Sequence, residues 1–374
     1  MNVLVIARSR KCSDNHLWRE ADLNGVNVSV LSSRSEECRC DRHSQHGLGQ
    51  IKCAPAWSFG TDTSRWIRNL KSELDASKPD LIHIDSEPWS LQVRNAIKTG
   101  LPVVPHAAEN IIGSAPWWFK LRRTGLTSQL RKVAGLAFWG ETSHRAIGEV
   151  FDLSSTPFAV VPACPPSPKD FSWRGAPIPT GVLRIGFVGS SAPYKGLPFL
   201  VSAIGRAGLG NGPVELHVLS TQGVSQSIQN VSFAEGIPME VRRATHPREV
   251  ADFMTKCDVI AVPSVRTRSV TEQWGRVAAE AQLMGIPVLL ADTGELPNQA
   301  TSLAKVLPDS DLDAWAHELS VLVADHRSER DSGLSAHHRP LIVQQEEVRA
   351  RFSMASYVDA ITNLWERALE RAHV

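Results

Sequence analysis

The hydrophobic residues of this chain gather in short continuous runs, separated by stretches of helical periodicity. The runs are rich in Val, Ile and Leu and do not alternate with polar residues, which is typical of parallel strands covered on both faces. Strand and helix alternate in this way twice, so we expect two doubly wound α/β domains. The expected strands are NVLVIA, VNVSVL, DLIHID, PVVPHA, GLAFWG and AVVPA in the first half, and LRIGFVG, VELHVLS, DVIAVPS and IPVLLAD in the second.

A segment dense in Pro and Gly separates the two sets of runs and predicts the domain boundary. We expect an N-terminal domain over 1–162, a linker over 163–181 and a C-terminal domain over 182–352. Residues 353–374 predict one amphipathic helix. Its apolar face comprises Tyr357, Ile361, Leu364, Trp365 and Leu369. The pattern leaves two positions open for this helix: it crosses back to the N-terminal domain, or it caps its own domain.

The composition is that of an ordinary globular protein, with 42% hydrophobic and 21% charged residues among 374. A formal net charge of +1 argues against a nucleic acid bound over a broad basic face. The start, MNVLVIARSRK, lacks the features of a signal peptide, and no apolar run reaches the roughly 18 residues of a membrane span. We therefore expect a cytoplasmic protein.

Six cysteines are scattered over the chain and do not form a disulfide framework. Cys38 and Cys40 lie close to Asp41 and His43, residue types that can hold a metal ion. A second pair of ligands is missing there, so a surface loop is the better interpretation. We expect no metal and no cofactor.

The segment from Pro263 to Pro297 carries the most informative polar pattern. It places Glu272 and Glu280 eight residues apart, with Gly275 between them. Positions i and i+8 of a helix differ by about 80° around the axis and about 12 Å along it. We expect Gly275 to hold Glu272 in the loop before a helix that contains Glu280. Free amides at a helix start bind anions and carboxylates accept hydrogen bonds from hydroxyls, which suits a nucleoside diphosphate sugar.

The EQWGR lead-in, the Glu-x7-Glu spacing and the following MGIPVLLADTGELP resemble the donor-site signature of the retaining family-4 glycosyltransferases. Enzymes of that family have the GT-B fold, in which two Rossmann-like domains face each other across a cleft. The resemblance implies that Glu272 bonds sugar hydroxyls and that Glu280 bonds the ribose. The backbone amides that it implies for holding sugar and phosphate are those of Trp274, Gly275, Arg276 and Val277.

The segment GSSAPYKG follows the strand LRIGFVG and resembles the phosphate motif of the same family. Gly189 and Lys195 match the motif, and Lys195 stands for the lysine that pairs with the donor diphosphate. Ser190 stands where the family has an arginine, which removes one positive charge from the leaving-group site. The arginines that can replace this charge are Arg266, Arg268 and Arg276. If no arginine replaces this charge, we expect the protein to bind the donor more weakly or to be catalytically inactive.

The loop after the first strand, ARSRKCSDNHLW, lacks the paired glycines that the family carries there. Such glycines let the backbone approach the donor phosphates closely. Arg8, Arg10 and Lys11 can supply charge in their place, or they can form a solvated loop. Both interpretations stay open.

Two polar segments of the N-terminal domain, HIDSEPWS and PHAAENI, follow expected strands, where open α/β sheets bind ligands. Both resemble acceptor-cleft segments of one branch of the family. They contain, in chain order, Asp85, Glu87, Trp89, His106, Glu109 and Asn110. The resemblance implies acceptor contacts for the first three and for Asn110, and a place near the reacting carbon for Glu109 or His106. A histidine packed at a strand end is the alternative for His106.

The stretch WWFKLRRTGLTSQLRK, residues 117–132, mixes aromatic and basic residues on an expected helix. Such a face can lie peripherally on an anionic membrane surface. A helix packed through its Trp residues, with a basic outer side, explains the same pattern and is favoured.

The resemblance implies a retaining, metal-independent glycosyltransferase that moves a hexose from a nucleoside diphosphate sugar to an acceptor hydroxyl. Two alternatives remain. A catalytically silent partner protein with this fold is motivated by Ser190 and the missing glycines. A sugar-nucleotide epimerase shares the fold, although the EQWGR lead-in does not resemble such enzymes. The base, the sugar and the acceptor, whether glycan, lipid-linked or small metabolite, stay open.

Overall fold

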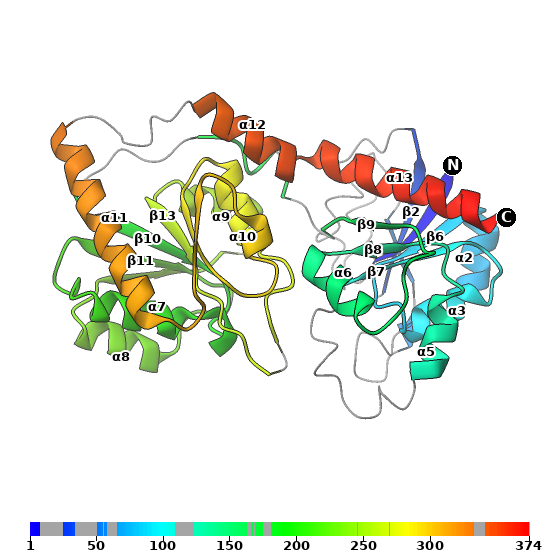
Figure 1. Ribbon diagram of the computed structural model, residues 1–374, viewed down its shortest axis with the longest axis horizontal. Helices are drawn as coiled ribbons and strands as arrows, with labels where there is room; N and C mark the ends of the chain where they lie inside the picture. Colours follow the sequence, from blue (N-terminus) through cyan, green and yellow to red (C-terminus); the bar gives the residue numbers. More distant parts are fainter. Residues whose placement is uncertain are drawn as a thin grey trace. The chain divides into compact units, whose positions relative to one another are not determined.

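The computed structural model describes residues 1–7, 25–33, 51–54, 56–57, 66–108, 123–162, 166–167, 169–174, 181–244, 246–268, 270–332 and 341–373. The chain divides into two compact units (Figure 1). The N-terminal unit comprises 1–167 together with 354–374, and the C-terminal unit comprises 168–353. The division between them falls inside the predicted linker.

The N-terminal unit contains a sheet of seven strands in the order β3-β2-β1-β6-β7-β8-β9. Every neighbouring pair in this sheet is parallel. Val3 of β1 lies opposite Val28 on one side and Leu81 on the other, which fixes the register at the centre. The strands are β1 (Asn2–Ala7), β2 (Asn27–Ser33), β3 (Ile51–Ala54), β6 (Leu81–Ile84), β7 (Val103–Ala107), β8 (Leu136–Phe138) and β9 (Phe158–Val160). A separate antiparallel pair is formed by β4 (Ala56–Trp57) and β5 (Trp66–Ile67).

The helices of this unit bury an apolar core against the sheet that includes Ile82, Phe138 and Ile147. They are α2 (Leu70–Ser77), α3 (Leu91–Ile97), α5 (Arg123–Leu130), α6 (Glu141–Gly148) and α13 (Met354–Ala372). Ser90 is the N-cap of helix α3. Its hydroxyl accepts a hydrogen bond from the Val93 amide at 3.3 Å.

The last helix, α13, packs along β7, β8 and β9 of the N-terminal unit (Figure 1). Ile361, Leu364 and Trp365 on its apolar face are fully buried. The Arg367 guanidinium donates to the Phe158 carbonyl at 2.7 Å, on the edge strand. Of the two positions that the amphipathic pattern left open, the helix occupies the one on the N-terminal sheet.

The C-terminal unit contains six parallel strands in the order β12-β11-β10-β13-β14-β15. The strands are β10 (Leu183–Val188), β11 (Val214–Leu219), β12 (Met239–Arg242), β13 (Val259–Val262), β14 (Val288–Ala291) and β15 (Ala304–Leu307). The helices are α7 (Leu197–Arg206), α8 (Gln226–Ala234), α9 (Pro247–Met254), α10 (Arg276–Leu283), α11 (Leu312–Ser332) and α12 (Leu341–Phe352), with short 3₁₀ helices η5 (Pro193–Lys195) and η6 (Pro297–Gln299). Figure 1 shows α7 and α8 on one side of this sheet and α9 and α10 on the other.

Five strands were not expected from the sequence: the short pair β4 and β5, and β3, β12 and β15, which lie at the edges of the two larger sheets. The sequence of β12, MEVR, alternates between half-buried and exposed positions. An edge strand needs no continuous apolar run because one of its sides faces no neighbouring strand, so its hydrophobic signal is weak.

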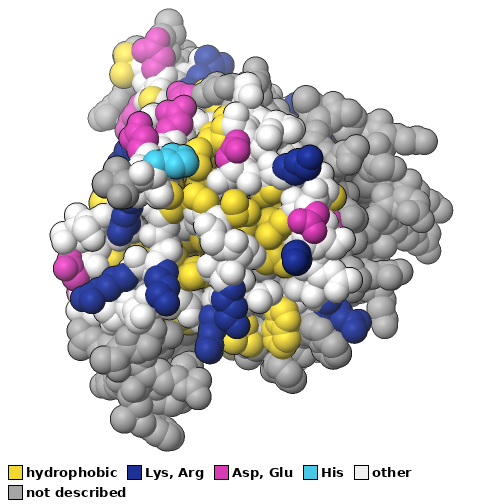
Figure 2. All heavy atoms as spheres, turned by 90° about the vertical axis from the view of Figure 1, so that its right-hand side faces the viewer, with side chains coloured by type: hydrophobic (Ala, Val, Ile, Leu, Met, Phe, Trp, Pro, Cys, Tyr) yellow, Lys and Arg dark blue, Asp and Glu magenta, His cyan; other side chains and the backbone are white. Residues whose placement is uncertain are grey.

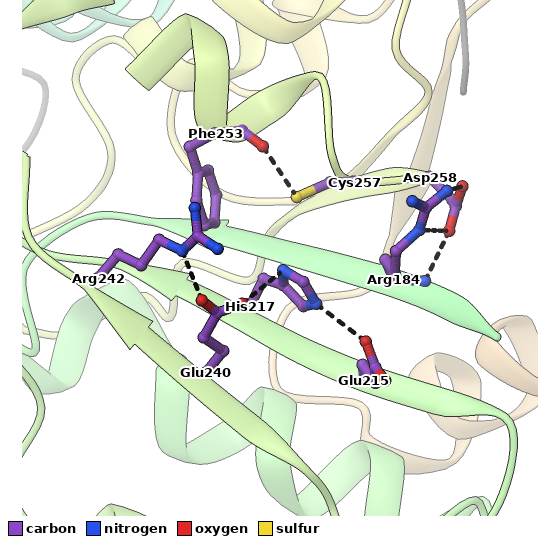
Figure 3. Close-up of polar contacts among 8 residues, drawn as sticks. All are labelled: Arg184, Glu215, His217, Glu240, Arg242, Phe253, Cys257 and Asp258. Carbon is purple, nitrogen blue, oxygen red and sulfur yellow. Dashed lines mark hydrogen bonds and ion pairs between the residues drawn. The ribbon is translucent and has the colours of Figure 1, made fainter. Parts of the chain in front are cut away.

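Polar side chains cross the C-terminal sheet near the first residues of its strands (Figure 3). The Arg184 guanidinium donates to both carboxylate oxygens of Asp258, at 2.9 and 2.7 Å, and the Arg184 amide donates to the same carboxylate at 2.7 Å. The further members of this group are Glu215, His217, Glu240 and Arg242. Of these contacts, Arg184–Asp258 and His217–Glu240 link neighbouring strands of the sheet.

Candidate functional site

The order of strands reverses between β10 and β13, because β11 lies beside β10 on the other side. The loops that follow β10 and β13 therefore run in opposite directions, and such a switch point in an open α/β sheet binds ligands. The loop after β10 contains Gly189, Ser190 and, in η5, Lys195. The loop after β13 contains Ser264 and Glu272.

Lys195, Ser264 and Glu272 form a bonded group at this switch point. Lys195 Nζ donates to both carboxylate oxygens of Glu272, at 2.8 Å to Oε2 and 3.1 Å to Oε1. Ser264 Oγ donates to Oε2 at 2.8 Å. The side chain of Glu272 is 7% exposed and that of Lys195 is 28% exposed. The carboxylate is thus held among donors, while the lysine side chain remains accessible to a ligand.

Two glycines in the left-handed conformation let the surrounding loops close on this group. Gly196 has φ 77° and lies against the Pro263 carbonyl, and Gly294 has φ 57° and lies against the Glu272 carbonyl. A Cβ atom at either position would collide with that carbonyl oxygen. The close approach of these loops therefore sets where Lys195 and Glu272 meet.

Helix α10 begins directly after the loop that carries Glu272. Its N-cap is Gly275, so Glu272 precedes the helix and Glu280 lies inside it, as the spacing predicts. Glu280 is 5% exposed and its carboxylate pairs with Arg276 Nε at 3.2 Å. Burial raises the pKa of Glu280 to about 7, and the Arg276 charge opposes this increase. A carboxylate so buried can accept hydrogen bonds from a neutral hydroxyl.

Two backbone amides of the turn from Trp274 to Val277 donate hydrogen bonds within the chain. The Gly275 amide donates to Gln299 Oε1 at 2.9 Å, and the Arg276 amide donates to the Trp274 carbonyl at 3.0 Å. The Trp274 ring packs edge to face against Phe352 of α12, with centroids 6.4 Å apart. The Gly275 and Arg276 amides therefore already have acceptors within the chain. A ligand at this turn would bind first to the amides of Trp274 and Val277.

Buried amide side chains hold η6 against α10, a feature that the sequence analysis missed. Gln282 Nε2 donates to the Ala278 carbonyl at 2.9 Å and to the Gln299 carbonyl at 3.1 Å. The Thr301 hydroxyl and amide both donate to Gln282 Oε1, at 2.7 and 3.0 Å. Gln282 and Gln299 are fully buried. Glutamines usually lie on the surface, so no local signal could have identified them.

Gln299→Met is expected to lower the free energy of unfolding by about 1–3 kcal/mol, because the buried Gly275 amide loses its acceptor. The measurement is urea unfolding followed by Trp fluorescence. Gln222→Met, at an exposed position of the same unit, is the matched control and should change stability by less than about 0.5 kcal/mol. Equal effects of the two substitutions would contradict the role given to Gln299.

The three arginines proposed to replace the missing family arginine differ in their surroundings. Arg276 is half exposed and paired with Glu280. Arg266 and Arg268 are exposed in the loop after β13, where the Arg266 amide donates to Asp309 at 3.3 Å. Ser190 is half-buried in the loop after β10. Arg266 and Arg268 therefore remain candidates for the replacement positive charge near Lys195.

In the N-terminal unit, Asp85, Glu87 and Trp89 lie just after β6, at the C-terminal edge of the sheet. Glu87 is 3% exposed, and its Oε1 accepts the Ala108 amide at 3.1 Å. The Trp89 ring stacks on Phe151 with centroids 6.5 Å apart. The bond from Ala108 to Glu87 joins the loops that follow β6 and β7, the two loops from which acceptor contacts are predicted.

His106 lies in β7 and is 1% exposed. Its Nε2 is bonded to the Val161 carbonyl, and its ring makes an edge contact with His83 of β6, with centroids 5.3 Å apart. This is the environment of a histidine packed at a strand end, the alternative raised for His106. A place near a reacting carbon stays a prediction.

His83 is a buried residue that the sequence analysis did not single out. Its Nδ1 accepts the Trp365 indole N–H of α13 at 3.3 Å. Burial, together with the neighbouring His106, holds the pKa of His83 well below its usual value. The acceptor role of Nδ1 requires that nitrogen to be unprotonated, so neutral His83 links α13 to the sheet.

Acidification from about pH 7 to about pH 5 is expected to lower the contribution of His83 to the free energy of unfolding. The unfolded chain binds a proton at His83 below its ordinary pKa, whereas the folded chain does not, so the stability that His83 contributes falls as pH falls. The loss amounts to at most about 1.4 kcal/mol per pH unit. Urea unfolding of the wild type and of His83→Asn across this range measures it. An unchanged pH slope in His83→Asn would show that other groups carry the effect.

Several predicted residues lie outside the described part of the chain. They are Arg8, Arg10, Lys11, Cys38, Cys40, Asp41, His43, Glu109 and Asn110. Of the predicted 117–132 helix, the structure has α5 over Arg123–Leu130, with Leu130 buried. Among the described residues, no cluster of three or more His, Cys, Asp or Glu side chains is arranged to hold a metal ion. No helix in the described ranges is long and apolar enough to span a membrane.

Comparison with known proteins shows what this part of the chain is similar to. Residues 183–325 match the family model "Glycosyl transferases group 1". D-inositol 3-phosphate glycosyltransferase from Segniliparus rotundus is 31% identical over 150 residues, which cover 37% of this chain and 32% of that protein. The chain spans less than half the length of the curated relatives it matches, several of which carry the same name.

Solved structures resemble the whole chain in fold. Sucrose-phosphate synthase from Thermosynechococcus elongatus matches with a TM-score of 0.73 at 15% identity, over 99% of each chain. HepE from Anabaena, solved with UDP and glucose, matches with a TM-score of 0.64 at 14% identity, over 97% of this chain and 99% of that one. The two parallel sheets therefore define a GT-B protein.

Residues 183–325 of this chain are similar to the group 1 glycosyltransferases. The matched stretch runs from β10 through α10 and into α11, so it contains Lys195, Ser264, Glu272 and Glu280.

Proposed function

We propose that this protein is a retaining glycosyltransferase that transfers a hexose from a nucleoside diphosphate sugar to an acceptor hydroxyl. The observation that carries the proposal is the bonding of Lys195 to Glu272 at the switch point between β10 and β13. A partly exposed ammonium group beside a buried carboxylate provides one charge for a diphosphate and one acceptor for sugar hydroxyls. The family match over 183–325 supports this interpretation.

In the proposed reaction, the acceptor oxygen attacks the anomeric carbon from the side on which the diphosphate departs. The bond from that carbon to the diphosphate oxygen breaks, and its electron pair stays with the leaving group. The acceptor proton passes to a phosphate oxygen of the leaving group, so no protein base is required. Lys195 and the start of α10 would stabilise the charge on the departing diphosphate.

The remaining donor contacts are proposed from the same unit. Glu280, buried in α10, would accept hydrogen bonds from the ribose hydroxyls, and Glu272 would accept them from the sugar. Lys195 also donates to Glu272, so sugar and lysine would share this carboxylate. The proposed reaction uses positioning and charge stabilisation, and it assigns no role to a metal ion or cofactor.

For the acceptor, we propose contacts from Asp85, Glu87 and Trp89 in the loop after β6. Glu87 is held by the Ala108 amide, so this loop has a defined conformation next to the end of β7. The name of the curated relatives makes D-inositol 3-phosphate the first acceptor to test. Glycans and lipid-linked acceptors are the next classes.

The test is a panel of UDP-, GDP-, ADP- and dTDP-sugars, screened by thermal shift and then by release of nucleoside diphosphate. Selective stabilisation with slow release, accelerated by an acceptor, is the expected result. Stabilisation without release from any acceptor would favour a catalytically silent partner protein, the alternative motivated by Ser190. Absence of any stabilisation would contradict a donor site at Lys195 and Glu272.

A further inference from the structure

A groove of about 1000 Å³ lies between α2 and α3 of the N-terminal unit, and its lining carries more cationic than anionic side chains. Four cationic side chains line it, those of Arg68, Lys71, Lys78 and Lys98, against one carboxylate, Asp75. All five residues are exposed. Figure 2 looks onto the side of this unit on which α2 and α3 lie, and it shows Lys and Arg side chains around a central area of hydrophobic side chains.

Lys78 and Lys98 lie at the C-termini of α2 and α3, where the helix dipole favours cations, but the dipole does not account for the other two charges. Arg68 and Lys71 lie at the start of α2, where the helix dipole disfavours cations. Lys78 ends the same helix with φ 41°, a left-handed conformation that normally selects Gly or Asn. In the described ranges, no ion pair joins Lys71, Lys78 or Lys98 to an acidic side chain. Their ammonium groups are therefore available to a ligand.

The chemistry of the lining indicates which ligand would fit. Leu70, Leu74 and Leu101 supply apolar surface, and Ser72 and Thr99 add hydroxyl groups. Lysine ammonium groups bind phosphate as compact point charges. The volume is at the upper end of the range for small-molecule sites. We propose that this groove binds a ligand that carries two or more clustered phosphate groups.

The groove is separate from the predicted acceptor residues of the same unit. It is lined by the segment between α2 and β6 and by the segment between α3 and β7, which lead into the N-terminal ends of these strands. Asp85, Glu87 and Trp89 lie beyond the C-terminal end of β6. Because the strands are parallel, the two sets of residues lie at opposite edges of the sheet. The ligand of the groove is therefore an accessory ligand rather than the acceptor, and the inference does not depend on the proposed reaction.

The test is isothermal titration of the full chain with sodium tripolyphosphate at low ionic strength. The groove variant is Lys71→Ala with Lys98→Ala, one exposed lysine from each wall. The matched control is Arg94→Ala with Lys132→Ala, which removes the same charge from exposed positions of the same unit outside the groove. We expect the groove variant to weaken binding about tenfold and the control less than about twofold.

Two further arms identify the source of the phosphate and the place of binding. Co-sedimentation with vesicles of cardiolipin, a lipid with two phosphate groups, and phosphatidylcholine uses the same variants. Groove-dependent binding to vesicles but not to tripolyphosphate would assign lipid headgroups, and the reverse would assign a soluble ligand. Binding that survives in the groove variant but disappears in Lys195→Ala would place the anion at the donor site and overturn the proposal. Absence of saturable binding in both arms, or equal losses in groove and control variants, would also overturn it.

Discussion

Lys195→Ala is expected to lower turnover by about 10²- to 10³-fold, with a smaller effect on the KM for the donor. The reason is that the proposed role of the ammonium group increases as negative charge develops on the departing diphosphate. An interaction that strengthens in the transition state affects kcat more than ground-state binding. The measurement is steady-state release of nucleoside diphosphate with the donor that the panel identifies.

The same substitution also leaves Glu272 buried without its cation, which is a cost to the folded state. A double-mutant cycle separates the two effects. Adding Glu272→Gln to Lys195→Ala should recover part of the stability, since the unpaired carboxylate is removed, but should not recover turnover. Recovery of both would mean that Lys195 acts only by holding the loop. Lys256→Ala, at an exposed position of the same unit, is the control for loss of a positive charge.

Glu280→Gln is expected to weaken donor binding by about tenfold and, at about pH 8, to stabilise the donor-free fold. The first effect follows because a neutral amide is a weaker acceptor for ribose hydroxyls than a carboxylate. The second follows because burial raises the pKa of Glu280 to about 7. In the folded chain the group binds a proton more tightly than in the unfolded chain, so the stability that Glu280 contributes falls as pH rises from the ordinary carboxyl pKa to about 7.

Titration calorimetry with the donor and urea unfolding at about pH 5 and pH 8 measure both effects. The gain in stability of Glu280→Gln over the wild type should be larger at the higher pH. Glu318→Gln is the control, since it removes a carboxylate paired with Lys305 elsewhere in the same unit. Wild-type donor affinity in Glu280→Gln would contradict the ribose assignment, and a stability difference independent of pH would contradict the direction of the pKa change.

The two predictions differ in what they require of the fold. Lys195 and Glu272 come from different loops, 77 residues apart in sequence, and meet only because β10 and β13 are neighbours. Arg276 and Glu280 lie one turn apart on α10, so their pairing follows from the helix alone. The first pair is therefore sensitive to changes in either loop, whereas the second depends on α10 remaining a helix.

The sequence alone predicted the parts of the fold that depend on local pattern. Continuous apolar runs marked the central strands of both sheets, because a strand buried on both faces tolerates few polar residues. Gly275 and the eight-residue spacing were sufficient to place Glu272 before α10 and Glu280 inside it. Exposed edge strands such as β12 left no comparable signal.

Tertiary structure decided what depends on distant residues coming together. The pairing of Lys195 with Glu272, the position of α13 on the N-terminal sheet and the bond from Trp365 to His83 all join segments that no periodicity connects. Gln299 resembles any surface glutamine until the fold buries it under Gly275. The spacing of hydrophobic residues indicates which face of a helix or strand is buried. Which neighbouring element covers that face depends on how the whole domain packs.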